Sequence, residues 1–194
     1  MSVHSKPYLT REQYLALERT AETKSEYLDG EMVAMTGVSL AHSRITSNIG
    51  RELGQQLKGR PCEVHTSDLR VWVPDTRLYA YPDVIVVCGE PRLTDEHFDT
   101  LTNPTVLVEV LSPSTQAYDR GRKFEAYTAL DSLREYLLVS QDRPRVEHLI
   151  RQEDRDHWLL SVESGLAASV VLPSIQCQLA MAEIYYRLSF DEKG

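Results

Sequence analysis

Residues 39–59 repeat their hydrophobic positions every three or four residues, which is the spacing of one face of a helix. Ile45, Ile49 and Leu53 form a single apolar stripe, and Gly59 ends the helix. His42 lies on the same stripe, so we expect its side chain to point inward. Further helices are predicted over residues 11–18, 119–130 and 181–190.

Shorter apolar runs bounded by Gly, Pro and Asp predict strands. A hairpin turns at Asp29–Gly30, and Pro74–Asp75 marks a second turn. The strand segments are EYLD, EMVAM, CEVHTS, LRVWVP, YPDVIVVC, PTVLVEVLS and REYLLVS, followed by a small antiparallel meander of RVEHLIR, HWLLSVE and SVVLPSI. The order helix, strands, helix, strand and antiparallel extension predicts a mixed α/β layer fold.

The composition is that of a globular protein, because 42% of the 194 residues are hydrophobic and 26% are charged. This length suits one domain, so we expect residues 1–194 to form a single domain. The start of the chain lacks the basic and then apolar order of a signal peptide, and the apolar runs are too short to cross a bilayer. We therefore expect a soluble, cytoplasmic protein.

The formal net charge is −8, whereas a general nucleic-acid binder is usually basic. The charge counts against a nuclease, although a local basic rim or a cluster of metal-binding acids is compatible with an acidic total. The sequence has neither a G-x-G-x-x-G after a strand nor a Walker loop, so nucleotide cofactors are not expected.

The three cysteines, Cys62, Cys88 and Cys177, are odd in number and widely spaced. This is not the pattern of a disulfide framework, so we expect all three to be buried and reduced. Cys62 and His65 form a C-x-x-H pair. A strand places residues three apart on opposite faces, which argues against a zinc site.

The strand VLVEVLSPST, residues 106–115, contains one carboxylate, Glu109, among apolar residues. A lone carboxylate in a dry core is unfavourable, so Glu109 pairs with a basic residue, faces solvent or lines a cation site. Asp83 opens the apolar strand YPDVIVV and by itself fits a strand-entry residue. If the two strands are neighbours, however, the two acids converge, and two carboxylates with water suit Mg²⁺ or Mn²⁺.

Lys123 in the following helix is the third candidate. At about 100° per residue it lies between the directions of Asp119 and Tyr127, at the border of the inward face. A lysine in this position can bury its stem and reach its ammonium toward the sheet. The alternative is a solvated helix lysine.

Four further residues are candidates for supporting roles, each with a structural alternative. Glu31 is an additional acid near the metal or a solvent-facing strand residue. His42 lines the site or is a core histidine bonded to backbone. Asp68 caps its strand or supports the site, and Asp119 caps its helix or orients Lys123.

Six blocks occur in the order EYLDGEMVAMTG, AHSRITSNIG, TSDLRVWVP, YPDVIVV, VLVEVLSPSTQAYDRGRKFEAY and SLREYLLVSQDRPRVEHLIR. Together they resemble the Uma-two family of restriction-endonuclease-like proteins, a domain family of the PD-(D/E)XK nuclease superfamily. The resemblance extends from about residue 9 to residue 188. It implies a restriction-endonuclease-like αβββαβ core with a mixed central sheet flanked by helices, to which the antiparallel strands and the last helix are added.

The resemblance also implies a reaction, the hydrolysis of phosphodiester bonds in DNA. Asp83 corresponds to the signature Asp and Glu109 to the acid of the E-x-K element. Leu111 stands where that element has its lysine, and in this family the lysine lies in the next helix, here as Lys123. Asp83, Glu109 and the backbone carbonyl of Val110 would then bind Mg²⁺ or Mn²⁺, with Lys123 as a positive charge beside the attacking water.

Two other functions stay open from the sequence. A non-enzymatic binding or regulatory protein on the same scaffold would fit the acidic charge and the missing E-x-K lysine. A hydrolase of a small phosphoester needs no basic surface. A homodimer is a further expectation, because Ile184, Tyr185 and Leu188 offer apolar surface on the last helix, although the same residues would equally close the core of a monomer.

Overall fold

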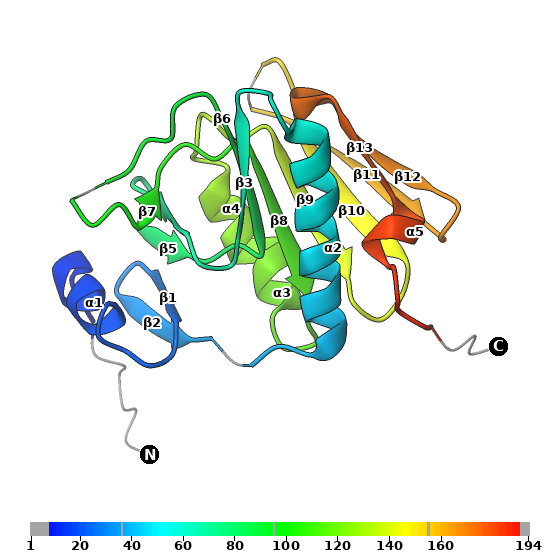
Figure 1. Cartoon of the computed structure of the whole chain (residues 1–194). Coiled ribbons are helices and arrows are strands. Elements are labelled where there is room, and N and C mark those ends of the chain that lie inside the picture. Colours follow the sequence, from blue (N-terminus) through cyan, green and yellow to red (C-terminus); the bar gives the residue numbers. More distant parts are fainter. Residues whose placement is uncertain (1–7, 36, 95, 155, 191–194) are drawn as a thin grey trace.

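A computed structural model describes residues 8–35, 37–94, 96–154 and 156–190 (Figure 1). The helical segments are α1 (Arg11–Glu18), α2 (Leu40–Leu57), α3 (Gln116–Tyr118), the π-helical turn η1 (Asp119–Lys123), α4 (Phe124–Tyr127), the 3₁₀ turn η2 (Pro173–Ile175) and α5 (Met181–Ile184). Within these ranges, none of the helices is long and apolar enough to span a membrane.

The strands form a six-stranded sheet, a five-stranded sheet and a two-stranded hairpin. They are β1 (Ser25–Leu28), β2 (Glu31–Ala34), β3 (Cys62–Thr66), β4 (Arg70–Val73), β5 (Leu78–Ala80), β6 (Val84–Cys88), β7 (Thr100–Leu101), β8 (Val106–Leu111), β9 (Glu135–Ser140), β10 (Arg145–Arg151), β11 (Trp158–Ser164), β12 (Ser169–Leu172) and β13 (Cys177–Ala180).

The six-stranded sheet has the order β11-β10-β9-β8-β6-β3 and mixes both strand directions. β3 pairs with β6 and β6 with β8 in antiparallel fashion, β8 and β9 are parallel, and β10 and β11 continue antiparallel. Along the chain, α2, β3, β6, β8, the helical segment 116–127 and β9 give the αβββαβ core. The predicted fold class is confirmed.

The helix α2 packs its apolar stripe against one face of this sheet (Figure 1). Ile45, Ile49 and Leu53 are fully buried, as their spacing predicted, in a core that they share with Val86 and Val108 of the sheet. The hairpin of β12 and β13 and the short helix α5 complete this layer. Because α2 is fixed in this way, its first turn lies at the end of β6 and β8 where the candidate site forms.

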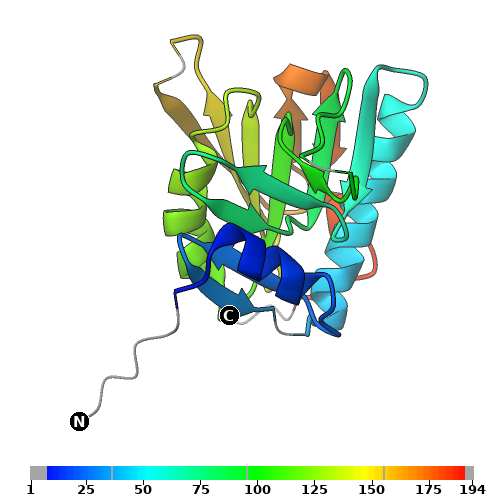
Figure 2. The same ribbon diagram turned by 90° about the vertical axis from the view of Figure 1, so that its left-hand side faces the viewer.

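The five-stranded sheet, with the order β2-β1-β5-β4-β7, lies on the other side of the six-stranded sheet (Figure 2). A second core cluster joins Val71 and Leu78 of this sheet to Ile85 and Leu107 of the larger one, and Tyr127 of α4 belongs to the same cluster. The helical segment 116–127 is therefore anchored between the two sheets.

The N-terminal hairpin turns at Asp29 and Gly30, as predicted, and both residues have a positive φ, of 44° and 93°. Its first strand, β1, pairs with β5 through Tyr27 and Tyr79. This pairing joins the hairpin to the body of the protein and aims Glu26 at the end of the six-stranded sheet.

The C-terminal part differs from the prediction. The strand β12 pairs with β13 in a separate hairpin and does not continue a meander with β10 and β11. The last helix ends at Ile184, and the chain then turns, with Arg187 at a φ of 65°. Ile184 and Tyr185 are buried and Leu188 packs against the same core, so these residues close the chain's own core instead of offering a surface to a second copy.

The prediction of three reduced cysteines is wrong for two of them. Cys62 and Cys88 form a disulfide, and their Cα atoms lie 4.0 Å apart. They are opposite residues of the antiparallel pair β3–β6, so the pairing register brings them together across 26 residues of sequence. Cys177 is free and buried, as expected.

Candidate active site

Glu109 lies within β8 and is only 4% exposed. Its Oε1 is 3.0 Å from Nζ of Lys123 and accepts a 3.1 Å hydrogen bond from Oη of Tyr127. Of the three explanations for a carboxylate in this strand, solvent exposure is therefore excluded, and an ion pair with a lysine is present. The remaining question is whether the same carboxylate also faces a cation site.

Asp83 lies directly before β6, at the end of the sheet where Glu109 is located. The register pairs Val84 with Val108, which places Asp83 beside Glu109 on the neighbouring strand. Oδ2 of Asp83 accepts a 2.7 Å hydrogen bond from the N–H of Val110. The N–H and C=O of one strand residue point to the same side, so the carbonyl of Val110 faces the same gap beyond β6.

His42 reaches Asp83 from the first turn of α2. Its Nε2 is 3.2 Å from Oδ2 of Asp83, and the residue is 8% exposed. The expectation that His42 points inward is met. Its side chain contacts Asp83 and lines the cavity, so of the two alternatives that the sequence left open the structure favours the site-lining one.

Lys123 ends a π-helical turn that starts at Asp119. The helix predicted over residues 119–130 instead runs from Gln116 to Tyr127 and contains this wider turn. Asp119 and Lys123 are 3% and 4% exposed, and Oδ1 of Asp119 is 3.6 Å from Nζ. Such π turns are frequent at functional sites, and here the turn aims both charged groups at Glu109.

Glu26 is a member of this cluster that the sequence reasoning missed. Its Oε1 is 2.7 Å from Nζ of Lys123, closer than Glu109 or Asp119, and accepts a 3.3 Å hydrogen bond from the N–H of Tyr81. The residue is 8% exposed. Like Glu109, Glu26 is a carboxylate within a strand, and it precedes the buried Tyr27. The apolar stretch around Glu26 is, however, too short to predict a buried strand from the sequence.

The charges of the cluster change the proton affinities of its members. Burial raises the pKa of Glu109 well above its usual range, which the charge of Lys123 opposes and the nearby Asp119 and Asp83 carboxylates reinforce. Burial alone would lower the pKa of Lys123, but Glu109, Glu26 and Asp119 together raise it well above its usual value. Lys123 is therefore an ammonium at neutral pH.

The pKa values of Asp119 and Tyr118 are also raised, partly by the negative charges around them. Burial raises the pKa of Asp119, and the charges of Glu26 and Asp83 add to this effect, whereas Lys123 lowers it. Burial and the charge of Glu26 raise the pKa of Tyr118 to about 12. The site thus favours cations and holds its protons more tightly than solvent-exposed acids do.

The clustered side chains line a cavity of about 300 Å³. Its walls include four carboxylates but a single ammonium. Ligand pockets commonly have volumes of this order. The charged residues on its walls are Glu26, Asp83, Glu109, Asp119 and Lys123, with His42 beside them.

The donor set fits a hard divalent cation. Among the residues that the structure describes, no three Asp, Glu, His or Cys side chains form a complete ion-binding cluster. Mg²⁺ does not need one, because it usually keeps several waters and binds one or two carboxylates together with substrate phosphates. Asp83, Glu109 and the carbonyl of Val110 supply that number of oxygen donors at one end of the sheet.

Two of the sequence-derived candidates lie outside the cluster. The Glu31 side chain is 54% exposed, and its Oε2 is 3.9 Å from Arg122. The Asp68 side chain is 90% exposed and pairs with Lys24. Neither residue lines the cavity.

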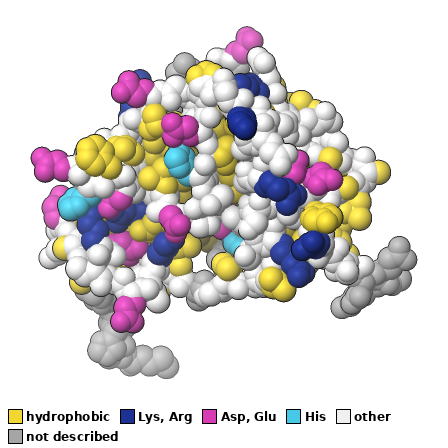
Figure 3. All heavy atoms as spheres, viewed as in Figure 1, with side chains coloured by type: hydrophobic (Ala, Val, Ile, Leu, Met, Phe, Trp, Pro, Cys, Tyr) yellow, Lys and Arg dark blue, Asp and Glu magenta, His cyan; other side chains and the backbone are white. Residues whose placement is uncertain are grey.

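The basic residues of α2 are engaged elsewhere. Lys and Arg side chains follow α2 in the space-filling view (Figure 3). Arg51 contacts Glu52 and Glu183, and Arg44 donates a hydrogen bond to the carbonyl of Arg187. These contacts are typical of a solvated helix face.

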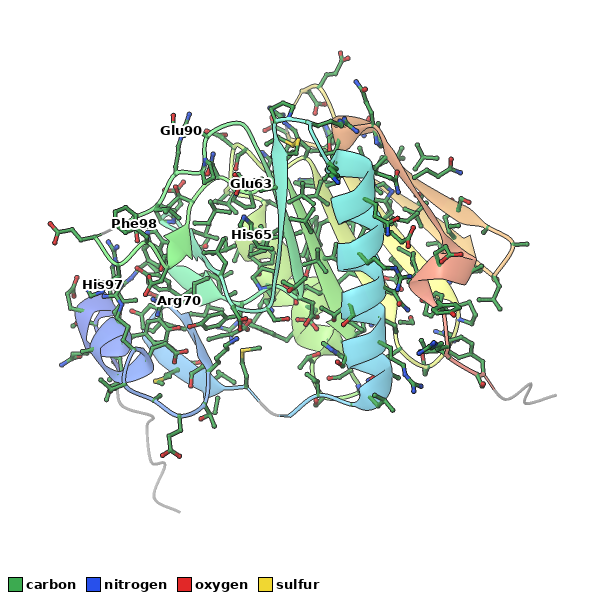
Figure 4. The ribbon with its side chains drawn as sticks, viewed as in Figure 1. Glu63, His65, Arg70, Glu90, His97 and Phe98 are labelled. Atoms are coloured by element: carbon green, nitrogen blue, oxygen red, sulfur yellow. A yellow bond between two sulfur atoms is a disulfide. The ribbon has the colours of Figure 1, made fainter. Side chains whose placement is uncertain are left out.

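The C-x-x-H pair is not a metal site. Figure 4 shows Glu63 and His65 projecting from β3, and their Oε2 and Nε2 atoms are 3.3 Å apart. The sulfur of Cys62 is bonded to Cys88, so it is not a thiolate ligand.

Residues 11–182 match the model of the Uma2 family, whose description reads "Putative restriction endonuclease". The chain belongs to this family. The resemblance of its six sequence blocks is thereby confirmed, and the match covers the αβββαβ core together with the N-terminal hairpin and β10 to β13.

Similar Uma2 relatives include two Synechocystis proteins. "Uncharacterized protein sll1609" is 39% identical over 170 residues, which are 88% of this chain and 96% of the relative. "Uncharacterized protein slr1290" is 37% identical over 184 residues, which are 95% of each chain.

A solved structure from Anabaena variabilis, described as "a putative nuclease belonging to DUF820", shares the fold. Its TM-score is 0.73 at 19% sequence identity, and the match covers 91% of this chain and 97% of that chain. The likeness supports the restriction-endonuclease-like architecture over almost the whole chain.

Proposed function

We propose that this Uma2 protein is a divalent-metal-dependent nuclease that hydrolyses phosphodiester bonds, with DNA as its substrate. The observation that carries the proposal is the convergence of Asp83, Glu109 and Lys123 on one cavity at the end of β6 and β8. The family description and the nuclease named in the Anabaena structure support the same class of reaction.

The residues that would hold the metal are Asp83, Glu109 and, through its carbonyl, Val110. A bound Mg²⁺ or Mn²⁺ supplies Lewis acidity, which polarises a phosphate oxygen and lowers the pKa of a bound water. Val110 serves this arrangement through both backbone groups, because its N–H fixes Asp83 while its carbonyl faces the gap. His42 restrains the same carboxylate oxygen, Oδ2 of Asp83, through Nε2.

The reaction adds water across one P–O bond. The water oxygen forms a new bond to phosphorus, and the bond to the leaving ester oxygen breaks with its electron pair on that oxygen. One water proton is released to solvent, and the leaving oxygen takes up a proton, so the products are a phosphomonoester and an alcohol. Lys123 places a fixed positive charge beside the phosphate, where negative charge grows in the transition state.

A specific observation favours a second candidate, a protein that binds nucleic acid without cutting it. Nζ of Lys123 already has three carboxylate partners, at 2.7, 3.0 and 3.6 Å. These contacts compensate the ammonium, so less of its charge is left to stabilise the negative charge that grows on a phosphate during cleavage. In such a protein the cluster would be an internal ion-pair network that fixes the hairpin to the core.

Thermal unfolding and DNA cleavage together test the proposal. A ligand that binds only the folded state raises its stability by mass action, so millimolar Mg²⁺ or Mn²⁺ should raise the Tm of the wild type. Asp83→Asn and Glu109→Gln should lose this shift and should not cleave labelled DNA. Glu31→Gln, which changes an exposed acid outside the cavity, is the matched control and should behave as the wild type.

The outcomes separate the two candidates. A metal-dependent shift with cleavage supports the nuclease. A wild type that neither responds to metal nor produces cleaved DNA, while still binding it, supports the binding protein and rejects the nuclease.

A further inference from the structure

We propose that a second cavity, on the other side of Asp83, is a subsite that binds the sugar–phosphate unit next to the scissile phosphate. The inference rests on the proposed nuclease function and extends it to the shape of the substrate. The second cavity has a volume of about 460 Å³. It adjoins the first one, because His42, Tyr81 and Asp83 line both.

The two cavities together make a groove that passes Asp83 on both sides. One arm contains Glu109 and Lys123, and the other contains the hydroxyl groups described below. A phosphate positioned at Asp83 therefore has room for further chain in two directions. A phosphodiester inside a nucleic-acid strand requires this geometry, because the strand continues on both sides of the phosphate. A terminal phosphomonoester would need only one of the two cavities.

Apart from Lys24, His42 and Asp83, the lining of the second cavity is uncharged and rich in hydroxyl groups. Hydroxyl groups donate to phosphate oxygens and both donate to and accept from sugar oxygens, so this lining matches a sugar–phosphate unit. The hydroxyl-bearing residues on its walls are Thr23, Ser43, Thr46, Ser47, Thr66 and Ser67.

Thr46 is the observation that points to a ligand. The residue is 8% exposed, and its Oγ1 is buried without a hydrogen-bond partner in the part of the chain that the structure describes. A helical threonine normally satisfies its hydroxyl through the carbonyl of the preceding turn, and buried polar groups are normally paired. Thr46 lines the second cavity, and a rotation about χ1 would turn this hydroxyl toward a ligand there, which would supply the missing partner.

The wall that carries Thr46 is held in place by close packing. Gly50 lies one turn further along α2, and a Cβ atom at this position would be 3.0 Å from Cγ2 of Thr66 on β3. The helix therefore approaches the strand closely at this point. Thr46 and Thr66 belong to two elements that are packed together before any substrate arrives, which lowers the cost of ordering the subsite.

Lys24 is the cation of this subsite. Its Nζ donates a 2.7 Å hydrogen bond to the carbonyl of Ser67 and pairs with Asp68. The Lys24 side chain is 40% exposed, so it remains open to a phosphate at the mouth of the cavity. One lysine and several hydroxyl groups fit a single strand, and this explains how an acidic chain can bind a polyanion without a large basic surface.

The test uses Thr46→Val, which removes the hydroxyl and keeps the shape of the side chain. The probe is a fluorescent single-stranded DNA oligonucleotide, and its Kd is measured by anisotropy in EDTA. We expect the Kd to rise about fivefold, as for one lost hydrogen bond. Thr46→Ser should bind as the wild type. Thr94→Val is the matched control, because the Thr94 hydroxyl is also buried and unpartnered within the described residues but lines neither cavity.

Two further readouts distinguish a subsite from a structural role. Without DNA, Thr46→Val should keep or raise the Tm, because an unsatisfied buried hydroxyl is removed. The KM for a small diester, bis(4-nitrophenyl) phosphate, should not change, since this molecule does not fill the second arm. A lower Tm with unchanged oligonucleotide affinity would overturn the subsite.

Failure of the subsite and failure of the nuclease give different results. If the wild type cleaves DNA and Thr46→Val binds the oligonucleotide normally, the subsite is rejected and the nuclease stands. If the wild type does not cleave but binding depends on the Thr46 hydroxyl, the nuclease is rejected and the subsite stands. If the wild type does not bind the oligonucleotide, the subsite is rejected.

Discussion

Nζ of Lys123 lies 2.7 Å from Oε1 of Glu26 and 3.0 Å from Oε1 of Glu109, so the ammonium is shared between the N-terminal hairpin and the central sheet. The N–H of Tyr81 holds the Glu26 carboxylate in this position. Because Glu26 and Glu109 both attract Lys123, neither carboxylate binds the ammonium alone. We infer that Glu26 is a positioning residue, because its carboxylate shares the Lys123 ammonium with Glu109.

The first prediction concerns Glu26→Gln. Without the Glu26 charge, the ammonium should move toward Glu109 and compete with a divalent cation there. We expect the Mg²⁺ concentration for half-maximal cleavage to rise about tenfold, while the KM for DNA changes little. A Mg²⁺ titration of the initial cleavage rate measures this. Glu31→Gln is the matched control in the same hairpin, with a side chain that is 54% exposed, and equal behaviour of both variants would contradict the role of Glu26.

Glu26 also shows where sequence reasoning stops. Glu26 and Glu31 both belong to the block EYLDGEMVAMTG, and the sequence suggested Glu31 as a further acid of the site, whereas the inward acid is Glu26. The choice is made by pairing of β1 with β5 through Tyr27 and Tyr79, a contact between segments about 50 residues apart. Such long-range pairing leaves no local periodicity in a four-residue strand, so the acid that faces the site could not be predicted.

Asp83, Glu109 and Lys123 were predictable because each stands out locally. Asp83 opens one strongly apolar strand, Glu109 interrupts another, and Lys123 lies at the border of the inward helix face. The order helix, strands, helix, strand follows from the same patterns, whereas the αβββαβ core was implied by the family resemblance. The disulfide of Cys62 and Cys88 could not be predicted in this way. It depends on the register of β3 against β6, which the sequence does not specify.

The second prediction concerns Lys123→Met. Removing the only ammonium of the cavity leaves buried carboxylates without a counter-charge, which should lower the free energy of unfolding by about 3–5 kcal/mol. Because Asp83 and Glu109 would then need a cation more than before, Mg²⁺ should raise the Tm of this variant further than that of the wild type. Calorimetry with and without Mg²⁺ measures both effects.

The control for this prediction is Lys58→Met, which changes an exposed lysine at the end of α2. It should leave both the stability and the Mg²⁺ response unchanged. A Lys123→Met protein that unfolds at the wild-type temperature and ignores Mg²⁺ would show that the carboxylates are protonated and do not attract cations.

The third prediction concerns Asp99 and acid stability. Burial raises the pKa of Asp99, but hydrogen bonds from Arg19, Thr100 and Arg70 outweigh it and bring the pKa well below its usual range. Figure 4 shows Arg70, whose guanidinium contacts Asp99 and whose side chain is 3% exposed. A lowered folded-state pKa contributes stability above the unfolded pKa of about 3.9, and this contribution is lost as the pH falls further.

Asp99→Asn should therefore lower the free energy of unfolding by about 1 kcal/mol at pH 7, since solvent screens a carboxylate that is a third exposed. The difference from the wild type should shrink below about pH 4. Urea unfolding at pH 7 and pH 3 measures it. Asp75→Asn, in an exposed turn, should show no such pH dependence, and a penalty of equal size at both pH values would show that the Asp99 charge is not the cause.

The last prediction concerns the salt dependence of oligonucleotide binding. Each phosphate neutralised on a single strand contributes about −0.7 to the slope of log K against log salt concentration. Lys24 and Lys123 are the lysines that line the two cavities, so we expect a slope near −1.4 from about two such contacts. Lys24→Gln should reduce its magnitude by about 0.7, whereas Lys58→Gln, on the exposed face of α2, should leave it unchanged. Fluorescence anisotropy over a series of NaCl concentrations gives the slope. A value several times steeper would mean that an extended basic surface binds the strand, and that the hydroxyl-lined groove is not the main contact.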